Sequence, residues 1–225
     1  HGIQNRFEIT NAKVITVTSA CSSFANAMEI VEGYFAMNKC SKALIVASEN
    51  NSAYNDESNI KSGHLWGDGA VAVFISKEKT SGSDLEILAI DTTGLGNVGK
   101  SIEAVTLQPR TGKTNMPYGK DVYIHATQYL VDAINRILDD NDFRIGDVDY
   151  LITHQANMRI IENVRKKLDI DPSKVLSNID QLGNTGCAST PIVLSENIDK
   201  LKIGDLVCIS VFGGGYSSGA ILLKK

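Results

Sequence analysis

Hydrophobic residues along the chain form short apolar runs that alternate with stripes of helical spacing. β-Branched residues dominate an alternating run over residues 13–19, which predicts a strand. Apolar side chains then recur every three or four residues from Phe24 to about Lys39, as in a helix, and a continuous apolar run follows at residues 43–48. Residues 13–48 therefore predict a strand, a helix and a buried parallel strand, which together make a βαβ unit.

The rest of the chain continues this alternation. Strands are predicted at residues 70–75, 85–91, 148–154, 206–212 and 218–223, with a short one at 175–176. Helices are predicted at residues 121–141, 157–168 and 188–201. Residues 92–120 are rich in glycine, threonine and asparagine and are too long for a simple connection, so we expect a functional or interface loop there.

The order of these elements indicates an internal duplication within an α/β fold. Residues 85 onward predict β-α-β-α-β-α-β-β, whereas residues 13–76 predict only β-α-β-β, and the two closing segments share their glycine placement. If the halves are copies, the first lacks its opening β-α-β-α. We therefore expect residues 1–80 to be the remainder of an N-terminal half, residues 81–225 to be a complete C-terminal half, and the chain to lack an N-terminal part.

Composition narrows the class of protein. The chain has 225 residues, 43% of them hydrophobic and 21% charged, which is typical of a globular protein. It has neither an apolar run of membrane-spanning length nor a secretion signal in its first residues, so we expect a cytoplasmic protein that does not bind membranes. A formal charge of −4 argues against nucleic-acid binding, and four cysteines without a CxxC pair argue against a metal site.

Cys21 stands where the predicted strand gives way to the predicted helix. Unpaired amide groups at a helix N-terminus favour a negative charge, so the pattern predicts a thiol shifted toward the nucleophilic thiolate. The alternative, a small buried side chain with no chemical role, has equal weight on this stretch alone.

Two further polar residues follow a strand or occupy a tight turn, His154 and Asn184. Strand ends of a parallel sheet converge on one edge, where α/β proteins place their sites. A Cys-His-Asn set in this order also occurs in papain-like proteases, but Ser22 follows Cys21 here and the strand pattern is that of an α/β protein, so a protease is a remote alternative.

Five short motifs decide between these hypotheses. They are Ser19-Ala-Cys21-Ser, Gly67-Asp-Gly69, His154-Gln-Ala-Asn157-Met-Arg159, Gly183-Asn184-Thr-Gly-Cys-Ala-Ser189 and Phe212-Gly-Gly-Gly-Tyr216. Together they closely resemble the β-ketoacyl-acyl-carrier-protein synthase III family, condensing enzymes of the thiolase superfamily. The resemblance implies a duplicated βαβαβαββ fold in five αβαβα layers, here with the first half truncated.

The resemblance also implies roles for single residues. Cys21 would accept an acyl group from coenzyme A, and His154 and Asn184 would donate hydrogen bonds to the thioester oxygen of a malonyl group as it loses carbon dioxide. Preorganised donors stabilise such developing charge. The backbone N–H groups of Cys21 and Gly214 would form an oxyanion hole. Phe212 would be a wall of the substrate site, although plain core packing has equal weight.

Substrates and partners follow from the same resemblance. The substrates would be an acyl-CoA and malonyl-acyl-carrier protein, with no permanently bound cofactor, and the enzyme would act as a homodimer. Asn157 would bind the pantetheine arm, while Arg159, Arg165 and Lys166 would dock the acidic carrier protein. A merely solvated helix face is the alternative for this basic run.

The implied reaction is a decarboxylative Claisen condensation that starts the synthesis of a fatty acid or related polyketide. Ser22, Ser23 and Cys187 depart from the small residues expected beside Cys21 and Asn184, which leaves the acyl primer open. The alternative is a non-catalytic subunit or one of specialised metabolism. The intact set of Cys21, His154 and Asn184 argues against a loss of catalysis.

Overall fold

The structure, a computed structural model, describes residues 1–108 and 113–225. Its α-helices are α1 (Gly2–Arg6), α2 (Ser23–Ala36), α3 (Gly119–Asp139), α4 (Met158–Leu168), α5 (Ile179–Leu182) and α6 (Ser189–Glu196). Its strands are β1 (Lys42–Asn50), β2 (Asp68–Ser76), β3 (Glu86–Gly94), β4 (Thr106–Gln108), β5 (Lys113–Asn115), β6 (Tyr150–Thr153), β7 (Leu206–Gly213) and β8 (Ser217–Lys224). Short 3₁₀ helices are η1 (Asn51–Ala53), η2 (Gly63–Leu65), η3 (Ser101–Glu103), η4 (Ile145–Asp147), η5 (Pro172–Lys174), η6 (Gly186–Ala188) and η7 (Ile198–Lys200).

The second half of the chain forms a four-stranded sheet in the order β3-β8-β7-β6. β8 is antiparallel to both neighbours, and β6 is parallel to β7. Val175 adds a single parallel bridge to Leu151 of β6, which is the short strand predicted at residues 175–176. The predicted order β-α-β-α-β-α-β-β is therefore present from β3 to β8.

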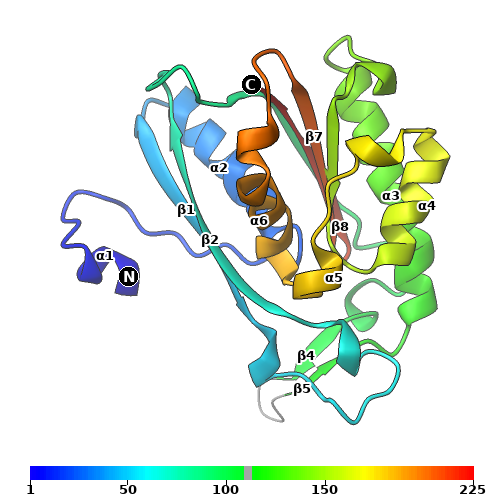
Figure 1. Ribbon diagram of the computed structural model, residues 1–225. Helices are drawn as coiled ribbons and strands as arrows, with labels where there is room; N and C mark the ends of the chain where they lie inside the picture. The colour runs from blue at the N-terminus through cyan, green and yellow to red at the C-terminus, as the bar shows by residue number, and fades with distance from the viewer. Residues whose placement is uncertain (109–112) are drawn as a thin grey trace.

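Helices cover both faces of this sheet (Figure 1). On one face, Cys208 and Phe212 of β7 pack in a core with the apolar stripes of α3 and α4. On the other face, Val207, Ile209 and Val211 pack with α2 and α6. All eight residues of β7 are consequently buried, which explains why its sequence is a continuous apolar run rather than an alternating one.

β1 and β2 form a separate two-stranded antiparallel sheet on the far side of α2 and α6 (Figure 1). Its inner face contributes Ile45 and Ile75 to the core that contains α2. Its outer face is uncovered in the described part of the chain, and Phe74 is 83% exposed there. The molecule thus has four of the five expected layers: a two-stranded sheet, two helices, a four-stranded sheet and two helices.

Residues 13–18 have no regular secondary structure and Ser19 forms only an isolated bridge to Cys21, so the predicted strand is absent. In the second half, the corresponding segment contains Val175, which pairs with Leu151 of β6. The described residues of the first half contain no strand that corresponds to β6, so residues 13–19 have no such neighbour to pair with. The predicted βαβ unit at residues 13–48 is therefore wrong, because β1 pairs with β2 in an antiparallel ladder and with no parallel neighbour in the described residues.

Two further elements differ from prediction. The helix predicted at 188–201 ends at Glu196 and is followed by η7, and the loop predicted at 92–120 contains the β4–β5 hairpin.

No helix among the described residues combines the length and apolar character needed to cross a bilayer.

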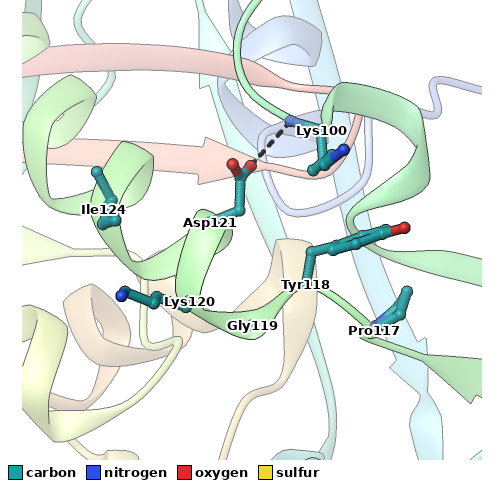
Figure 2. A pocket seen from close by; sticks show the side chains of 7 residues that line it. All are labelled: Lys100, Pro117, Tyr118, Gly119, Lys120, Asp121 and Ile124. Atoms are coloured by element: carbon teal, nitrogen blue, oxygen red, sulfur yellow. Dashed lines mark hydrogen bonds between the residues drawn. The ribbon is translucent and has the colours of Figure 1, made fainter.

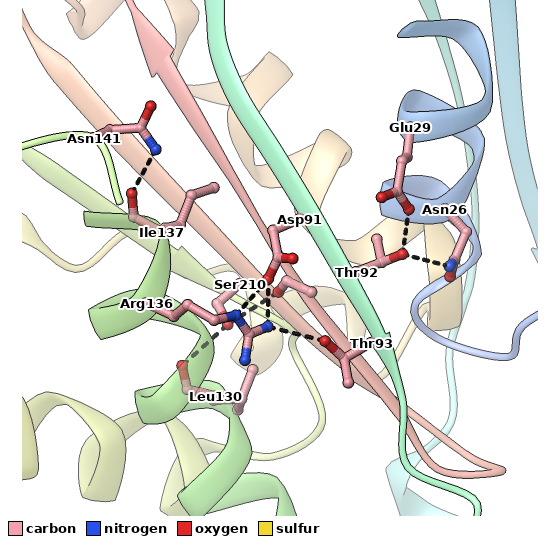
Figure 3. A network of polar contacts seen from close by, with 11 residues as sticks. Asn26, Glu29, Asp91, Thr92, Thr93, Leu130, Arg136, Ile137, Asn141 and Ser210 are labelled. Carbon is pink, nitrogen blue, oxygen red and sulfur yellow. Dashed lines mark hydrogen bonds and ion pairs between the residues drawn. The ribbon is translucent and has the colours of Figure 1, made fainter. Parts of the chain in front are cut away.

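Polar side chains tie the edge strand β3 to helices on both of its faces (Figure 3). Arg136 of α3 donates to Asp91, with an Nε–Oδ2 distance of 2.7 Å, and to the Thr93 hydroxyl at 3.1 Å. On the opposite face, Thr92 hydrogen-bonds Glu29 and accepts from Asn26 of α2 at 3.2 Å. β3 is therefore fixed between the outer helix α3 and the central helix α2.

Candidate active site

Cys21 occupies a tight turn that leads directly into α2. Ala20 before it has a left-handed backbone, with φ of 48°. Serine hydroxyls hold the turn: Ser22 Oγ donates to the Ser19 carbonyl at 2.8 Å, and Ser23 Oγ donates to the Ala20 carbonyl at 2.6 Å. Ser22 and Ser23, which looked like departures in the sequence, therefore stabilise the turn that presents Cys21.

The end of β7 lies against the Cys21 turn. A Cβ atom on Gly213 would stand 2.8 Å from the Ser19 carbonyl oxygen and 2.9 Å from the Cys21 nitrogen, closer than any side chain tolerates. A Cβ atom on Gly214 would lie 3.7 Å from that of Ala20. Glycine is thus needed at position 213 for the close approach of the two backbones, and this approach brings Gly214 beside the Cys21 turn.

His154 follows β6 and is buried, with 3% of its surface exposed. Its backbone N–H continues the β6–β7 pairing by donating to the Ser210 carbonyl at 2.8 Å. Its Nδ1 lies 2.9 Å from Ser189 Oγ, and that hydroxyl also accepts the Gln155 N–H at 3.4 Å. Because Ser189 Oγ already accepts the Gln155 N–H, we infer that it donates its own proton to Nδ1 of His154. In that tautomer the imidazole proton of His154 is on Nε2.

Asn184 is held between two segments that are distant in sequence. Its N–H donates to the Leu65 carbonyl at 2.7 Å, and its carbonyl accepts from the Gly67 N–H at 2.9 Å. Its side-chain Oδ1 accepts the Gly186 N–H at 2.9 Å. Because the oxygen end of the amide is occupied by its own turn, the Nδ2 end remains as a hydrogen-bond donor.

Burial controls the protonation states in this region. Cys21 is half-buried, and burial of its thiol together with the Glu49 carboxylate raises its pKa to about 12. The expectation of a thiolate at the helix N-terminus is therefore wrong for the resting thiol. Burial also lowers the pKa of His154 to about 4, so its imidazole is neutral at pH 7.

One segment connects the predicted site residues. Residues 184–189 carry Asn184 and contact His154 through Ser189. They also carry Cys187, whose pKa is raised by burial, by Glu49 and to a smaller extent by the Cys21 thiol. His154 and Asn184 therefore both lie beside the turn that begins α6, and Cys21 is near enough to that turn to affect the pKa of Cys187. Among residues 1–108 and 113–225, no group of three His, Cys, Asp or Glu side chains is arranged to hold a metal ion.

Comparisons with known proteins agree on one family. The family model of the 3-oxoacyl-[acyl-carrier-protein] synthase III C-terminal part matches residues 138–225, and the model of 3-oxoacyl-[acyl-carrier-protein] synthase III matches residues 15–94. A β-ketoacyl-[acyl-carrier-protein] synthase III of Oleidesulfovibrio alaskensis is 32% identical over 99% of this chain and 71% of its own length. The chain belongs to this family.

Other relatives give the same result. The synthase III of Desulfotalea psychrophila is 33% identical over 99% of this chain and 71% of its own length. The crystal structure of the Aquifex aeolicus synthase III matches with a TM-score of 0.89 and 30% identity, over 99% of this chain and 70% of that one. The thiolase-like α/β fold expected from the sequence motifs is therefore confirmed.

Two of the predicted binding residues of this synthase have clear structural roles. Asn157 is the N-cap of α4, where its Oδ1 accepts the Ile160 N–H at 3.0 Å. Phe212 is 4% exposed, and its ring centroid lies 4.8 Å from that of Tyr216 and 6.3 Å from that of Tyr129. The aromatic packing toward α3 favours the core alternative for Phe212.

The basic residues of α4 are of two kinds. Arg159 and Lys166 are exposed. Arg165 donates to Glu162 at 3.1 Å and to the Ile170 carbonyl at 3.3 Å, so it stabilises the C-terminal end of its own helix. Of the predicted docking residues, Arg159 and Lys166 are thus the ones whose charge faces solvent.

A cavity of about 350 Å³ opens at the start of α3, and its lining does not include Cys21, His154 or Asn184 (Figure 2). It is lined by Lys100, Pro117, Tyr118, Gly119, Lys120, Asp121 and Ile124. Asp121 accepts the Lys100 N–H at 2.9 Å and the Tyr216 hydroxyl at 2.8 Å. The cavity wall is therefore linked to the residue that follows the Gly213–Gly215 turn, a connection that no motif in the sequence indicated.

Proposed function

We propose that this chain carries out the synthase III reaction through Cys21, His154 and Asn184. Membership of the family makes it an acyltransferase that condenses an acyl primer with malonyl-acyl-carrier protein to initiate fatty acid synthesis. One observation supports the roles of His154 and Asn184 above all: Ser189 Oγ lies against Nδ1 of His154 and the Gly186 N–H occupies Oδ1 of Asn184, so Nε2 and Nδ2 are the atoms left to donate to a substrate.

The first half-reaction is acyl transfer to Cys21. The sulfur attacks the carbonyl carbon of the acyl-CoA thioester, the new C–S bond forms, and the C–S bond to coenzyme A breaks. The proton that leaves Cys21 is recovered by the departing coenzyme A sulfur. The N–H groups of Cys21 and Gly214 would bind the carbonyl oxygen during the attack, consistent with the close contact between their two turns.

The second half-reaction is condensation. The malonyl thioester loses carbon dioxide, and its electron pair moves onto the thioester oxygen as an enolate. Neutral His154 and Asn184 are suited to donate to that oxygen, since a buried donor in a dry site stabilises developing charge strongly. The enolate carbon then attacks the acyl carbonyl, and Cys21 leaves as thiolate and takes up a proton.

Carrier-protein docking is assigned to α4. Arg159 and Lys166 supply exposed positive charge, which suits the acidic surface and phosphopantetheine of the carrier. Asn157 begins the same helix and would adjoin the pantetheine arm. We further propose that residues 1–80 and 81–225 are the two thiolase-like parts, and that the working enzyme is a cytoplasmic homodimer built on the first-half sheet.

Mass spectrometry of the intact protein tests the function directly. Incubation with a panel of acyl-CoAs should add one acyl group, and peptide mapping should place it on Cys21. Carbon dioxide release from malonyl-acyl-carrier protein measures the second step. A protein that binds the carrier but is acylated by no primer and releases no carbon dioxide would instead be a non-catalytic subunit.

A further inference from the structure

Glu49, the penultimate residue of β1, contacts the turn that carries Asn184. Its Oε1 accepts the Cys187 N–H at 2.9 Å. The same carboxylate lies over Gly186, where an added Cβ would stand 2.4 Å from Oε1. Gly186 has a left-handed backbone with φ of 53°, and its N–H is the group that fixes Asn184 Oδ1 at 2.9 Å. One carboxylate thus lies over Gly186, whose N–H holds the Asn184 side chain, and accepts a hydrogen bond from the next residue, Cys187.

The duplication gives this contact a counterpart in the second half. Glu49 is the penultimate residue of β1 and Gly213 is the last residue of β7, so each stands near the turn end of the first strand of an antiparallel pair. Gly213 contacts the turn before α2, whereas Glu49 contacts the turn before α6. Each strand end therefore supports a helix start of the other half, one through bare backbone and the other through a carboxylate.

We propose that Glu49 is a positioning residue of the synthase: its carboxylate fixes the turn at residues 184–188 and thereby the direction in which the Asn184 amide donates. The inference rests on the proposed role of Asn184. Sequence motifs did not single out Glu49, because its function depends on a contact across 138 positions of the chain.

The effect of the Glu49 charge on ionisation of Cys187 gives a second measure of the contact, one that needs no substrate. Among the described residues, no Lys, Arg or His forms an ion pair with it. Burial and the Glu49 carboxylate both raise the pKa of Cys187, to about 12, with Cys21 as the other ionisable group that acts on it. Removal of the charge should therefore ease ionisation of Cys187, whatever reaction the protein catalyses.

Two variants separate the hydrogen bond from the charge. Glu49→Gln keeps an acceptor for the Cys187 N–H but removes the charge, and Glu49→Ala removes both. Glu32→Gln removes the same charge from an exposed position on α2 and serves as the control. Carbon dioxide release from malonyl-acyl-carrier protein and acylation of Cys21 are measured separately, with thermal unfolding as a check on folding.

Glu49→Ala should lower decarboxylation about tenfold, the effect of one lost hydrogen bond of ordinary strength, while Glu49→Gln stays within about threefold of the parent. Acylation of Cys21 should change less in both. Unchanged decarboxylation in Glu49→Ala, an equal loss in Glu49→Gln, or an equal loss of both half-reactions would overturn the positioning role.

Alkylation distinguishes a failure of this inference from a failure of the proposed function. At pH 8, iodoacetamide should label Cys187 about tenfold faster in both Glu49 variants than in the parent or in Glu32→Gln, which corresponds to a pKa lower by about one unit. If the parent releases no carbon dioxide, the proposed function fails, yet this rate still decides whether Glu49 acts on the turn. An unchanged rate would show that it does not.

Discussion

The turns before α2 and α6 have the same backbone construction and different chemistry. In each, a residue with a left-handed backbone precedes a cysteine: Ala20 with φ of 48° before Cys21, and Gly186 with φ of 53° before Cys187. Each helix starts two residues after its cysteine, at Ser23 and at Ser189. The duplicated frame therefore places two thiols in equivalent turns.

The Cys21 turn and the Cys187 turn are contacted by different groups. The Cys21 turn lies directly against the backbone of Gly213 at the end of β7. The Cys187 turn is contacted directly by the Glu49 carboxylate, which accepts the Cys187 N–H at 2.9 Å. Burial and the same carboxylate raise the pKa of both thiols to about 12, so the direct contact, and not the thiol pKa, distinguishes the two turns. The two turns thus share a backbone geometry and differ in the strand end that packs against them, which is glycine backbone at Cys21 and a carboxylate at Cys187.

Replacement of each cysteine by alanine is the strongest way to break this comparison. Cys21→Ala should abolish acylation by acyl-CoA, a loss on the order of 10³-fold or more because the nucleophile is gone. Cys187→Ala should remain within about threefold of the parent, since its thiol is not required as a nucleophile. Intact-mass analysis after a timed incubation measures both, and acylation of Cys187 in the Cys21→Ala variant would refute the distinction.

His154 and Asn184, both from the second half, should affect the other half-reaction. His154→Ala and Asn184→Ala should each lower decarboxylation by roughly 10²–10³-fold, as expected for a donor to a developing oxyanion, and lower Cys21 acylation much less. His64→Ala, at an exposed histidine, is the matched control. Comparable losses in both half-reactions would mean that these side chains do not act on the malonyl oxygen.

Sequence patterns predicted the second half well and the first half less well. β7 and β8 were predicted within a few residues because helices cover both faces of their sheet and make an apolar run unambiguous. Residues 13–19 have an equally good strand pattern but no strand, since a strand needs a hydrogen-bonded neighbour that no local pattern reveals.

The site shows the same limit. Cys21, His154 and Asn184 were predicted from motifs, and the structure connects His154 and Asn184 through the segment at residues 184–189. The protonation of Cys21 was mispredicted because the helix N-terminus is visible in sequence, whereas burial and Glu49 are not. The roles of Ser189, Gly213 and Glu49 likewise depend on contacts between distant segments, and no spacing rule along the chain indicated them.

The buried His154 should make folding stability depend on pH. Its folded pKa of about 4 lies below the unfolded value of 6.5, so the unfolded chain binds more protons between these values. This contribution is fully present above about pH 6.5 and is lost as the pH falls toward 4, to a total of about 3 kcal/mol. Urea unfolding at pH 7 and pH 5 measures the loss, and His154→Gln should flatten it. An equally steep dependence in His154→Gln would assign it to other groups.

The contact of β7 with the Cys21 turn gives the smallest effect and the finest test of the comparison. Gly213→Ala adds a Cβ atom 2.8 Å from the Ser19 carbonyl oxygen, and relief of that overlap should cost about 1–3 kcal/mol of unfolding free energy. It should also slow Cys21 acylation, because the turn must move away from Gly214. Gly146→Ala, where an added Cβ meets nothing within 4 Å, is the matched control and should change neither quantity. Urea unfolding and the rate of Cys21 acylation are measured for both variants under the same conditions. If Gly213→Ala is as stable and as active as Gly146→Ala, close backbone contact does not distinguish the Cys21 turn from the Cys187 turn.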